Sequence, residues 1–387
     1  MATNNEPFRV LIAGAGIGGL ATAISLARVS GIPNLDIQIY EQAPELLEIG
    51  ASIALSPNAC PIVPVEHWKT DQVLSVDTYT NVRDRRHQTT RFHRGHLHGA
   101  LLSHVPRSSI HLNKRVIRAE AGEEGAVLYF EDGSEAHGGL IIAADGLRSK
   151  VRQSLIPDYQ LKFTGKVFVR STFDASLVEG KVPDLPHDAI HWWGPKDSFF
   201  ASRLGKGQYT TVGAYDDPRS GPELDVAWNQ PGSVDLFRAR FGGDSSWNPV
   251  VRRLAELTPS VRLFPNYAGA LALGLALRHV AVELGASLVL PEIQRALTLY
   301  DRTRRPHATR LLGIIHGALK PTQKSYGSAE EEDDALMKRF KNRPDLTWLS
   351  EHDVEAAFKQ TEEELEGTKG TQQLVVAETN SKPKSKF

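Results

Sequence analysis

The sequence has few of the features that mark secreted, membrane-spanning or polyanion-binding proteins. Its one cysteine, Cys60, cannot form an internal disulfide, and no basic and apolar signal stretch precedes the first strand, so we expect a cytoplasmic protein. No segment reaches the roughly 18 uncharged apolar residues that a transmembrane helix needs. The 45 Lys and Arg residues nearly balance 46 Asp and Glu, so nucleic acid is not an expected partner.

The chain begins with the pattern of an α/β domain. An apolar run at 8–13 predicts a strand, helical spacing at 21–30 predicts a helix, and alternation at 36–40 predicts a second strand. This order implies a parallel sheet. With 387 residues, the chain is long enough for two domains.

A glycine-rich turn joins the first strand to the helix. Gly14, Gly16 and Gly19 permit a tight turn, a close approach of backbone to a pyrophosphate, and close packing of helix on strand. Glu41 follows the second strand, where a carboxylate can accept hydrogen bonds from a ribose. Together these residues predict a site for a dinucleotide, either NAD or FAD.

Later segments change from this pattern to short β segments and then to helices. We expect a helix at 96–105, a β-hairpin that turns at Asp132-Gly133, and a buried strand at 140–144 that ends in Asp145-Gly146. Alternating segments between 160 and 217 predict an antiparallel sheet. Residues 271–317 are expected to be helical, the acidic run 330–334 to begin a solvated helix, and the polar tail from Gly367 to be disordered.

Four segments carry a family resemblance: AGAGIGGLATAISLA, YEQAPELLEIGASIALSPNA, RFHRGHLHGALL and LIIAADGLRSKVR. They resemble the class A FAD-dependent aromatic monooxygenases, in particular the salicylate hydroxylase-like members, over most of residues 8–360. The resemblance implies that Arg94 contacts the flavin dinucleotide. It also implies that Asp145 and Gly146, with Arg148 beside them, touch FAD and the nicotinamide donor. An NAD-only dehydrogenase would leave these residues unexplained.

The resemblance implies a Rossmann-like FAD-binding domain with a parallel sheet, an inserted antiparallel-sheet substrate domain and C-terminal helices. We place the FAD-binding domain at 1–158 and the substrate domain at 159–260. A shortened helical return to the first domain follows at 261–320, then a helical extension and flexible tail at 321–387.

The implied reaction is hydroxylation of a phenolic or salicylate-like aromatic, with a polyketide-derived ring among the options. It uses FAD, NAD(P)H and O2 and passes through a flavin C4a-hydroperoxide, and a homodimer is left open. The candidate catalytic residues lie in the predicted antiparallel sheet and are Arg170, His191 and Tyr209, with Tyr215 also considered. Trp192, Trp193 and Phe200 are candidate apolar walls, although neighbouring strand residues face opposite ways and the two tryptophans cannot line one pocket.

Two departures from the family pattern predict weakened FAD binding. Members of the family carry a Gly-Asp motif after a later strand, and this sequence lacks it. Gly243-Asp244 does not match the motif, because no apolar strand precedes it. The region where the motif is expected, 262–280, is shorter than the family pattern. A family helix after Asn58 is also absent, since Pro61 and Pro64 disfavour it. The alternative reading is therefore a degenerate or truncated flavoprotein without monooxygenase activity.

Four histidines lie close together in the sequence, His93, His96, His98 and His104. Positions two apart do not share a helix face, and no carboxylate or cysteine joins the group. We therefore expect no metal site.

Overall fold

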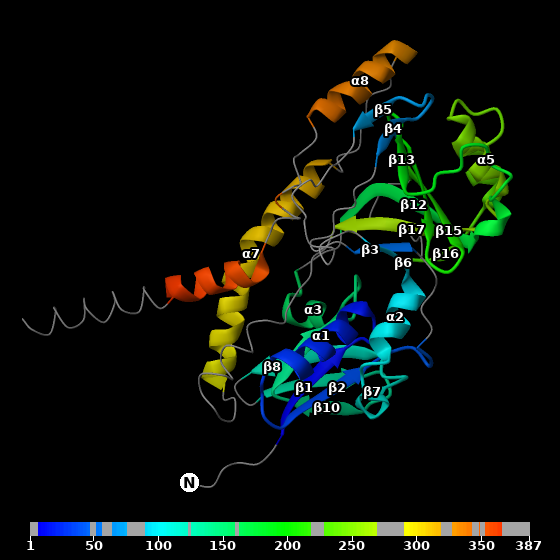
Figure 1. The fold of residues 1–387 in the computed structure, drawn as a ribbon. Coiled ribbons are helices and arrows are strands. Elements are labelled where there is room, and N and C mark those ends of the chain that lie inside the picture. Colours follow the sequence, from blue (N-terminus) through cyan, green and yellow to red (C-terminus); the bar gives the residue numbers. More distant parts are fainter. Residues whose placement is uncertain are drawn as a thin grey trace, which may run out of the picture.

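The computed structural model describes residues 7–46, 52–55, 64–75, 90–122, 125–158, 162–217, 228–268, 290–318, 327–342, 348 and 353–365. Two sheet-centred bodies lie one above the other, and the long helix α7 runs along one side (Figure 1). No helix in these ranges is long and apolar enough to cross a bilayer.

A four-stranded parallel sheet is the centre of the lower body. Its strand order is β11-β1-β2-β7, and the strands are β1 Phe8–Ala13, β2 Leu35–Tyr40, β7 Ile110–His111 and β11 Leu140–Ala143. The predicted strands and the parallel sheet are confirmed. Both β2 and β11 pair with β1, so the turns after β1 and β11 lie at the same edge of the sheet.

Both faces of this sheet are covered, which explains why β1 is an apolar run and not an alternating one. Val10 and Ile12 pack towards the helices, whereas Leu11 and Ala13 pack towards a second, three-stranded sheet. The helices are α1 Ile17–Val29, α2 Arg94–Leu102 and α7 Leu290–Ala318. The second layer consists of β8 Val116–Gly122, β9 Gly125–Phe130 and β10 Glu135–Gly138, with α3 Lys150–Leu155 and the short helix η2 Arg107–Ser109 nearby.

The upper body is an eight-stranded sheet with the order β16-β17-β12-β15-β14-β13-β4-β5. Its strands are β4 Val65–His67, β5 Val73–Ser75, β12 Lys162–Asp174, β13 Ile190–Trp193, β14 Ser198–Leu204, β15 Gln208–Asp216, β16 Gln230–Gly232 and β17 Val261–Ala268. The short helix η3 Ala175–Leu177 follows β12. The expected antiparallel pairing of β12, β14 and β15 is confirmed. Strands β4, β5 and β17 also belong to this sheet, although they lie outside the residues 159–260 that we assigned to the substrate domain. The boundaries of that domain stay a prediction.

The two faces of the upper sheet differ in what covers them. Helices α4 Val234–Phe241 and α5 Pro249–Leu257 pack on one face, which we call the core face, with Phe237, Phe241 and Leu254 against Phe199. The opposite face, the open face, meets the ribbon formed by β3 Ser52–Leu55 and β6 Thr90–His93. There the Thr210 hydroxyl lies 3.4 Å from that of Ser52.

Helix α8 (Ala329–Lys341) lies above β4 and β5 (Figure 1). The acidic run begins it as predicted, and the Ser328 hydroxyl caps it by accepting a hydrogen bond from the Glu331 N–H at 3.2 Å. His67 Nε2 lies 3.2 Å from an Asp333 carboxylate oxygen, which ties the helix to β4. Cys60, the segment 271–280 and the tail from Gly367 lie outside the described residues, and the predicted helix at 271–317 is described from Leu290.

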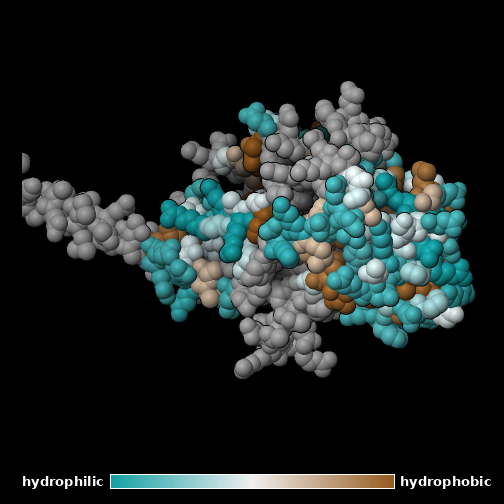
Figure 2. Space-filling view, turned by 90° about the horizontal axis from the view of Figure 1, so that it is seen from above, coloured by the Kyte–Doolittle hydropathy of each residue, from teal (hydrophilic) through white to brown (hydrophobic). Residues whose placement is uncertain are grey.

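Seen from above, the coloured surface is mainly hydrophilic, with hydrophobic residues in small separate groups (Figure 2). Among the described residues, the exposed large apolar side chains are Val73, Ile117, Leu155, Ile156, Trp228 and Leu236.

Candidate functional site

The three glycines of the first loop have different surroundings. Gly14 has a φ of +102°, and a Cβ there would lie 2.5 Å from the Ala144 carbonyl oxygen. A Cβ on Gly19 would collide with the carbonyl oxygen of Gly14. A Cβ on Gly16 would meet nothing within 4 Å. Gly14 and Gly19 are therefore required by the fold, whereas Gly16 borders open space where a ligand can approach the backbone.

The loop opens directly into helix α1. The N-cap residue of this helix, Gly16, has no side chain that could cap it, and the first turn of the helix contains no acidic residue. The first N–H groups of the helix are therefore available to an anion, and the helix dipole favours one. Glu41 lies beside the loop, where its Oε2 accepts a hydrogen bond from the Ala15 N–H at 2.8 Å and its Oε1 one from the Ala43 N–H at 2.9 Å. Both carboxylate oxygens keep a further lone pair for a ribose hydroxyl. These features fit a dinucleotide.

The Asp-Gly turn after β11 lies next to the glycine loop, because a Cβ on Gly14 would be 3.2 Å from the Asp145 Cα. Asp145 Oδ2 accepts hydrogen bonds from the N–H groups of Lys150, at 2.7 Å, and Val151, at 3.2 Å, so it helps the N-cap residue Ser149 to cap α3. Its Oδ1 is buried and has no hydrogen-bond partner among the described residues. Gly146 is exposed with a φ of +80°. The structure thus brings these two predicted cofactor residues to the same sheet edge as Gly14 and Gly16.

Arg94, the first residue of α2, lies close to Arg170 of β12. Burial and, to a smaller extent, repulsion from the Arg94 charge lower the pKa of Arg170. A guanidinium nevertheless stays protonated in a protein. Arg170 lies over the rings of Phe168 and Phe264, with its charge 5.6 and 5.3 Å from their centres, and its Nε is buried without a hydrogen bond in the described part of the chain. The positive charges of Arg94 and Arg170 therefore lie near each other where the lower body adjoins the open face.

Strand register places several candidate residues in one row on the open face. Arg170 pairs with Val212, Val212 with Phe200, and Phe200 with His191. Because neighbouring strands are about 4.8 Å apart, the backbones of Arg170 and His191, three strands apart, are separated by about 14 Å. They mark two ends of one face and do not converge on one atom.

The His191 end of the row is aromatic. The His191 ring makes edge contacts with Phe200 and Trp193, with ring centres 5.9 and 5.4 Å away. Phe340 of α8 lies 5.1 Å from the Trp193 ring. Helix α8 therefore contacts this end of the open face.

Tyr209 is not brought together with Arg170 and His191. It faces the core side of the sheet, where it is fully buried and burial raises the pKa of its hydroxyl. Trp192 is also buried on the core face, whereas Trp193 lies on the open face, so the prediction that the two tryptophans cannot line one pocket is confirmed. Tyr215 packs on the core side too, under the Arg240 guanidinium.

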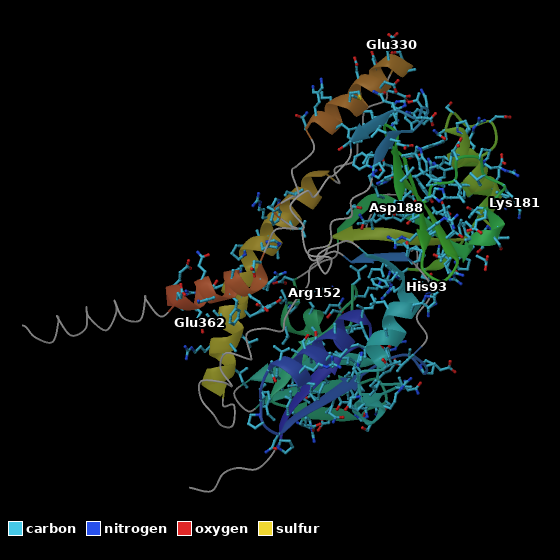
Figure 3. The ribbon with its side chains drawn as sticks, viewed as in Figure 1. His93, Arg152, Lys181, Asp188, Glu330 and Glu362 are labelled. Carbon is cyan, nitrogen blue, oxygen red and sulfur yellow. The ribbon has the colours of Figure 1, made fainter. Side chains whose placement is uncertain are left out.

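The histidine-rich segment has a role that the sequence did not predict. His98 is buried in α2, and its Nε2 lies 2.8 Å from the Ala15 carbonyl oxygen in the glycine loop. His93 lies at the junction of the two bodies (Figure 3), with its ring 4.7 Å from that of His96. Burial and, to a smaller extent, the neighbouring His96 lower the pKa of His93. In the ranges that the structure describes, no group of three potential ligands is placed to hold a metal. The short His spacings were the only sequence signal for His98.

The chain was compared with protein families and with individual proteins. No protein-family profile matches it. It is 28% identical over 282 residues to 6-hydroxynicotinate 3-monooxygenase of Bordetella bronchiseptica, covering 66% of this chain and 70% of that protein. It is 25% identical to salicylate hydroxylase of Pseudomonas putida, covering 92% and 94%. That alignment spans 429 positions and is longer than this chain of 387 residues, so the relative has internal segments that this chain lacks.

Solved structures share the fold. Salicylate hydroxylase in a substrate complex has a TM-score of 0.67 at 19% identity, over 92% of this chain and 98% of that one. CtdE in complex with FAD and a substrate has a TM-score of 0.69 at 17% identity, over 95% and 100%. The predicted combination of a parallel-sheet domain with an antiparallel sheet is confirmed.

Proposed function

Because the chain is homologous to the FAD-dependent aromatic monooxygenases, we propose that it hydroxylates a phenolic or salicylate-like aromatic compound with FAD, NAD(P)H and O2. The observation that carries the proposal is the position of Arg170. This partly buried cation lies on the open face beside Arg94, where the lower body meets the antiparallel sheet.

The protein's own groups would perform binding and positioning. FAD, when bound, accepts electrons from NAD(P)H and activates O2 to supply the oxygen atom that enters the ring. Gly16 and the first turn of α1 would hold the pyrophosphate, Glu41 the ribose, and Arg94 and Asp145 other parts of the dinucleotide. The aromatic substrate would lie on the open face.

Arg170 would hold an anionic oxygen of the substrate. A cation beside a phenol lowers the pKa of its hydroxyl and favours the phenolate, whose ring carbon is more nucleophilic. The sequence-similar proteins named for 6-hydroxynicotinate, salicylate and 6-methylsalicylate act on rings that carry both a hydroxyl and a carboxylate. A hydroxylated aromatic acid therefore matches the charge at Arg170. His191, Phe200 and Trp193 would form the aromatic wall at the other end.

The test begins with the visible spectrum of the purified protein and a titration with FAD followed by flavin fluorescence. We expect near-stoichiometric uptake of FAD, then NAD(P)H oxidation that phenolic acids stimulate, with one atom from 18O2 in the product. Exchanging Arg170 for Met should raise KM for a carboxylate-bearing phenol at least ten-fold while FAD affinity changes little. A protein that takes up no FAD would refute the proposal.

That last outcome corresponds to the alternative, a degenerate flavoprotein without activity. The long match with salicylate hydroxylase and the intact glycine loop do not favour it. The proposal also includes a cytoplasmic location, and it leaves the homodimer as a question for sedimentation analysis of the purified chain.

A further inference from the structure

Both backbone polar groups of Ala15, in the centre of the glycine loop, bond to side chains from other elements. The Ala15 N–H donates to Glu41 Oε2 at 2.8 Å, and the Ala15 carbonyl oxygen lies 2.8 Å from His98 Nε2. Because a carbonyl can only accept, the His98 Nε2 carries a proton and donates. Glu41 follows β2 and His98 lies in α2, so two separate elements hold this residue.

The hydrogen bond to His98 is buried and is not one of the backbone hydrogen bonds within α1. His98 is 4% exposed and Ala15 2% exposed. The Leu20 N–H bonds to the Gly16 carbonyl, so within the described part of the chain the Ala15 carbonyl has the His98 imidazole as its donor. A buried carbonyl that loses its donor is costly, which makes this contact a strong constraint on the loop.

His98 also connects the loop to a predicted cofactor residue. It lies four residues after Arg94 in α2, and residues at this spacing share one face of a helix. The same helix therefore holds the Ala15 carbonyl through one side chain and presents Arg94 through another.

We propose that His98 is a positioning residue of the FAD site, which fixes the glycine loop and the Arg94 helix relative to each other before FAD binds. The inference rests on FAD being the ligand of the proposed function. The imidazole does not touch FAD. It holds the Ala15 carbonyl so that the backbone N–H groups beyond Gly16 point to the pyrophosphate without reorganisation on binding.

The test compares two substitutions of nearly equal size. His98→Gln keeps an N–H donor at the same distance along the side chain, and His98→Leu removes it. We expect His98→Leu to weaken FAD binding about ten-fold or more, since the loop must then be ordered by the ligand. His98→Gln should recover most of the affinity. At saturating FAD, both variants should keep a near-normal KM for the aromatic substrate.

His104→Leu is the matched control, because His104 follows the same helix but is exposed, with its ring Nδ1 3.1 Å from the exposed Arg28 side chain. It should leave FAD affinity unchanged. If His98→Leu does not fold, His98→Asn takes its place, since its shorter amide cannot reach the Ala15 carbonyl.

Two results would overturn the proposal. One is FAD affinity of His98→Leu within two-fold of the unmodified protein. The other is equal weakening by His98→Gln and His98→Leu, which would make the imidazole a packing group. Failure of the unmodified protein to bind FAD would instead contradict the proposed function, so the two failures can be told apart.

Discussion

Alanine substitutions in the glycine loop should separate the requirements of folding from those of binding. At Gly14, the φ of +102° costs an L-residue about 1–2 kcal/mol. The added Cβ would also lie 2.5 Å from the Ala144 carbonyl oxygen, a backbone atom that cannot move aside easily. We expect Gly14→Ala to lower the free energy of unfolding of the FAD-free protein by about 3 kcal/mol.

Gly16→Ala should have the opposite pattern. The backbone of Gly16 is extended, with a φ of −69°, and a Cβ meets no atom within 4 Å. Alanine there should leave the free energy of unfolding of the FAD-free protein unchanged, or raise it by about 0.4–1 kcal/mol, because alanine lowers the conformational entropy of the unfolded chain. The methyl group would instead stand where the pyrophosphate approaches, so FAD affinity should fall at least ten-fold, which is about 1.4 kcal/mol.

Urea unfolding of the FAD-free proteins and FAD titration by fluorescence measure the two effects. Gly313→Ala is the control, because Gly313 lies exposed in α7 and its added Cβ also meets no atom within 4 Å. It should stabilise the helix by up to about 1 kcal/mol without altering FAD affinity. Normal FAD binding by Gly16→Ala would refute this expectation, because the pyrophosphate would then not lie against Gly16.

Substitutions at three further positions test residues of the sheets and the Asp-Gly turn. Tyr209→Phe should keep full activity and stability within about 1 kcal/mol, because the buried hydroxyl has no hydrogen-bond partner in the described part of the chain; loss of turnover would return Tyr209 to the candidate catalytic residues. Burial and the nearby Asp71 raise the pKa of Glu66, so the free energy of unfolding should fall as pH rises from the unfolded value of about 4.3 through the folded pKa. Glu66→Gln should remove that decrease in urea titrations at several pH values, and an unchanged pH profile would contradict it. Asp145→Ala should cost about 1 kcal/mol through lost capping of α3, and Asp145→Ser should recover part of it in thermal unfolding.

The sequence by itself determined the geometry of the glycine loop, where we propose that the dinucleotide binds. Gly14, Gly16 and Gly19 between an apolar strand and a helix specify a local geometry, because a tight turn, an open approach and a close packing contact each depend on residues within one turn of chain. The turn at Asp145-Gly146 could be predicted for the same reason, since it follows directly from a buried strand. That these two turns are neighbours also requires β1 and β11 to pair, which only the structure shows.

Only the tertiary structure decided which sheet residues share a face. Alternation along one strand separates Trp192 from Trp193, but it cannot say how Tyr209 on β15 is aligned with Arg170 on β12. Register between strands depends on turn geometry and on the pairing of distant segments, and a shift of one residue exchanges the two faces. The bond from His98 to Ala15 is equally non-local, because it joins residues 83 positions apart that meet only when α2 packs beside the loop.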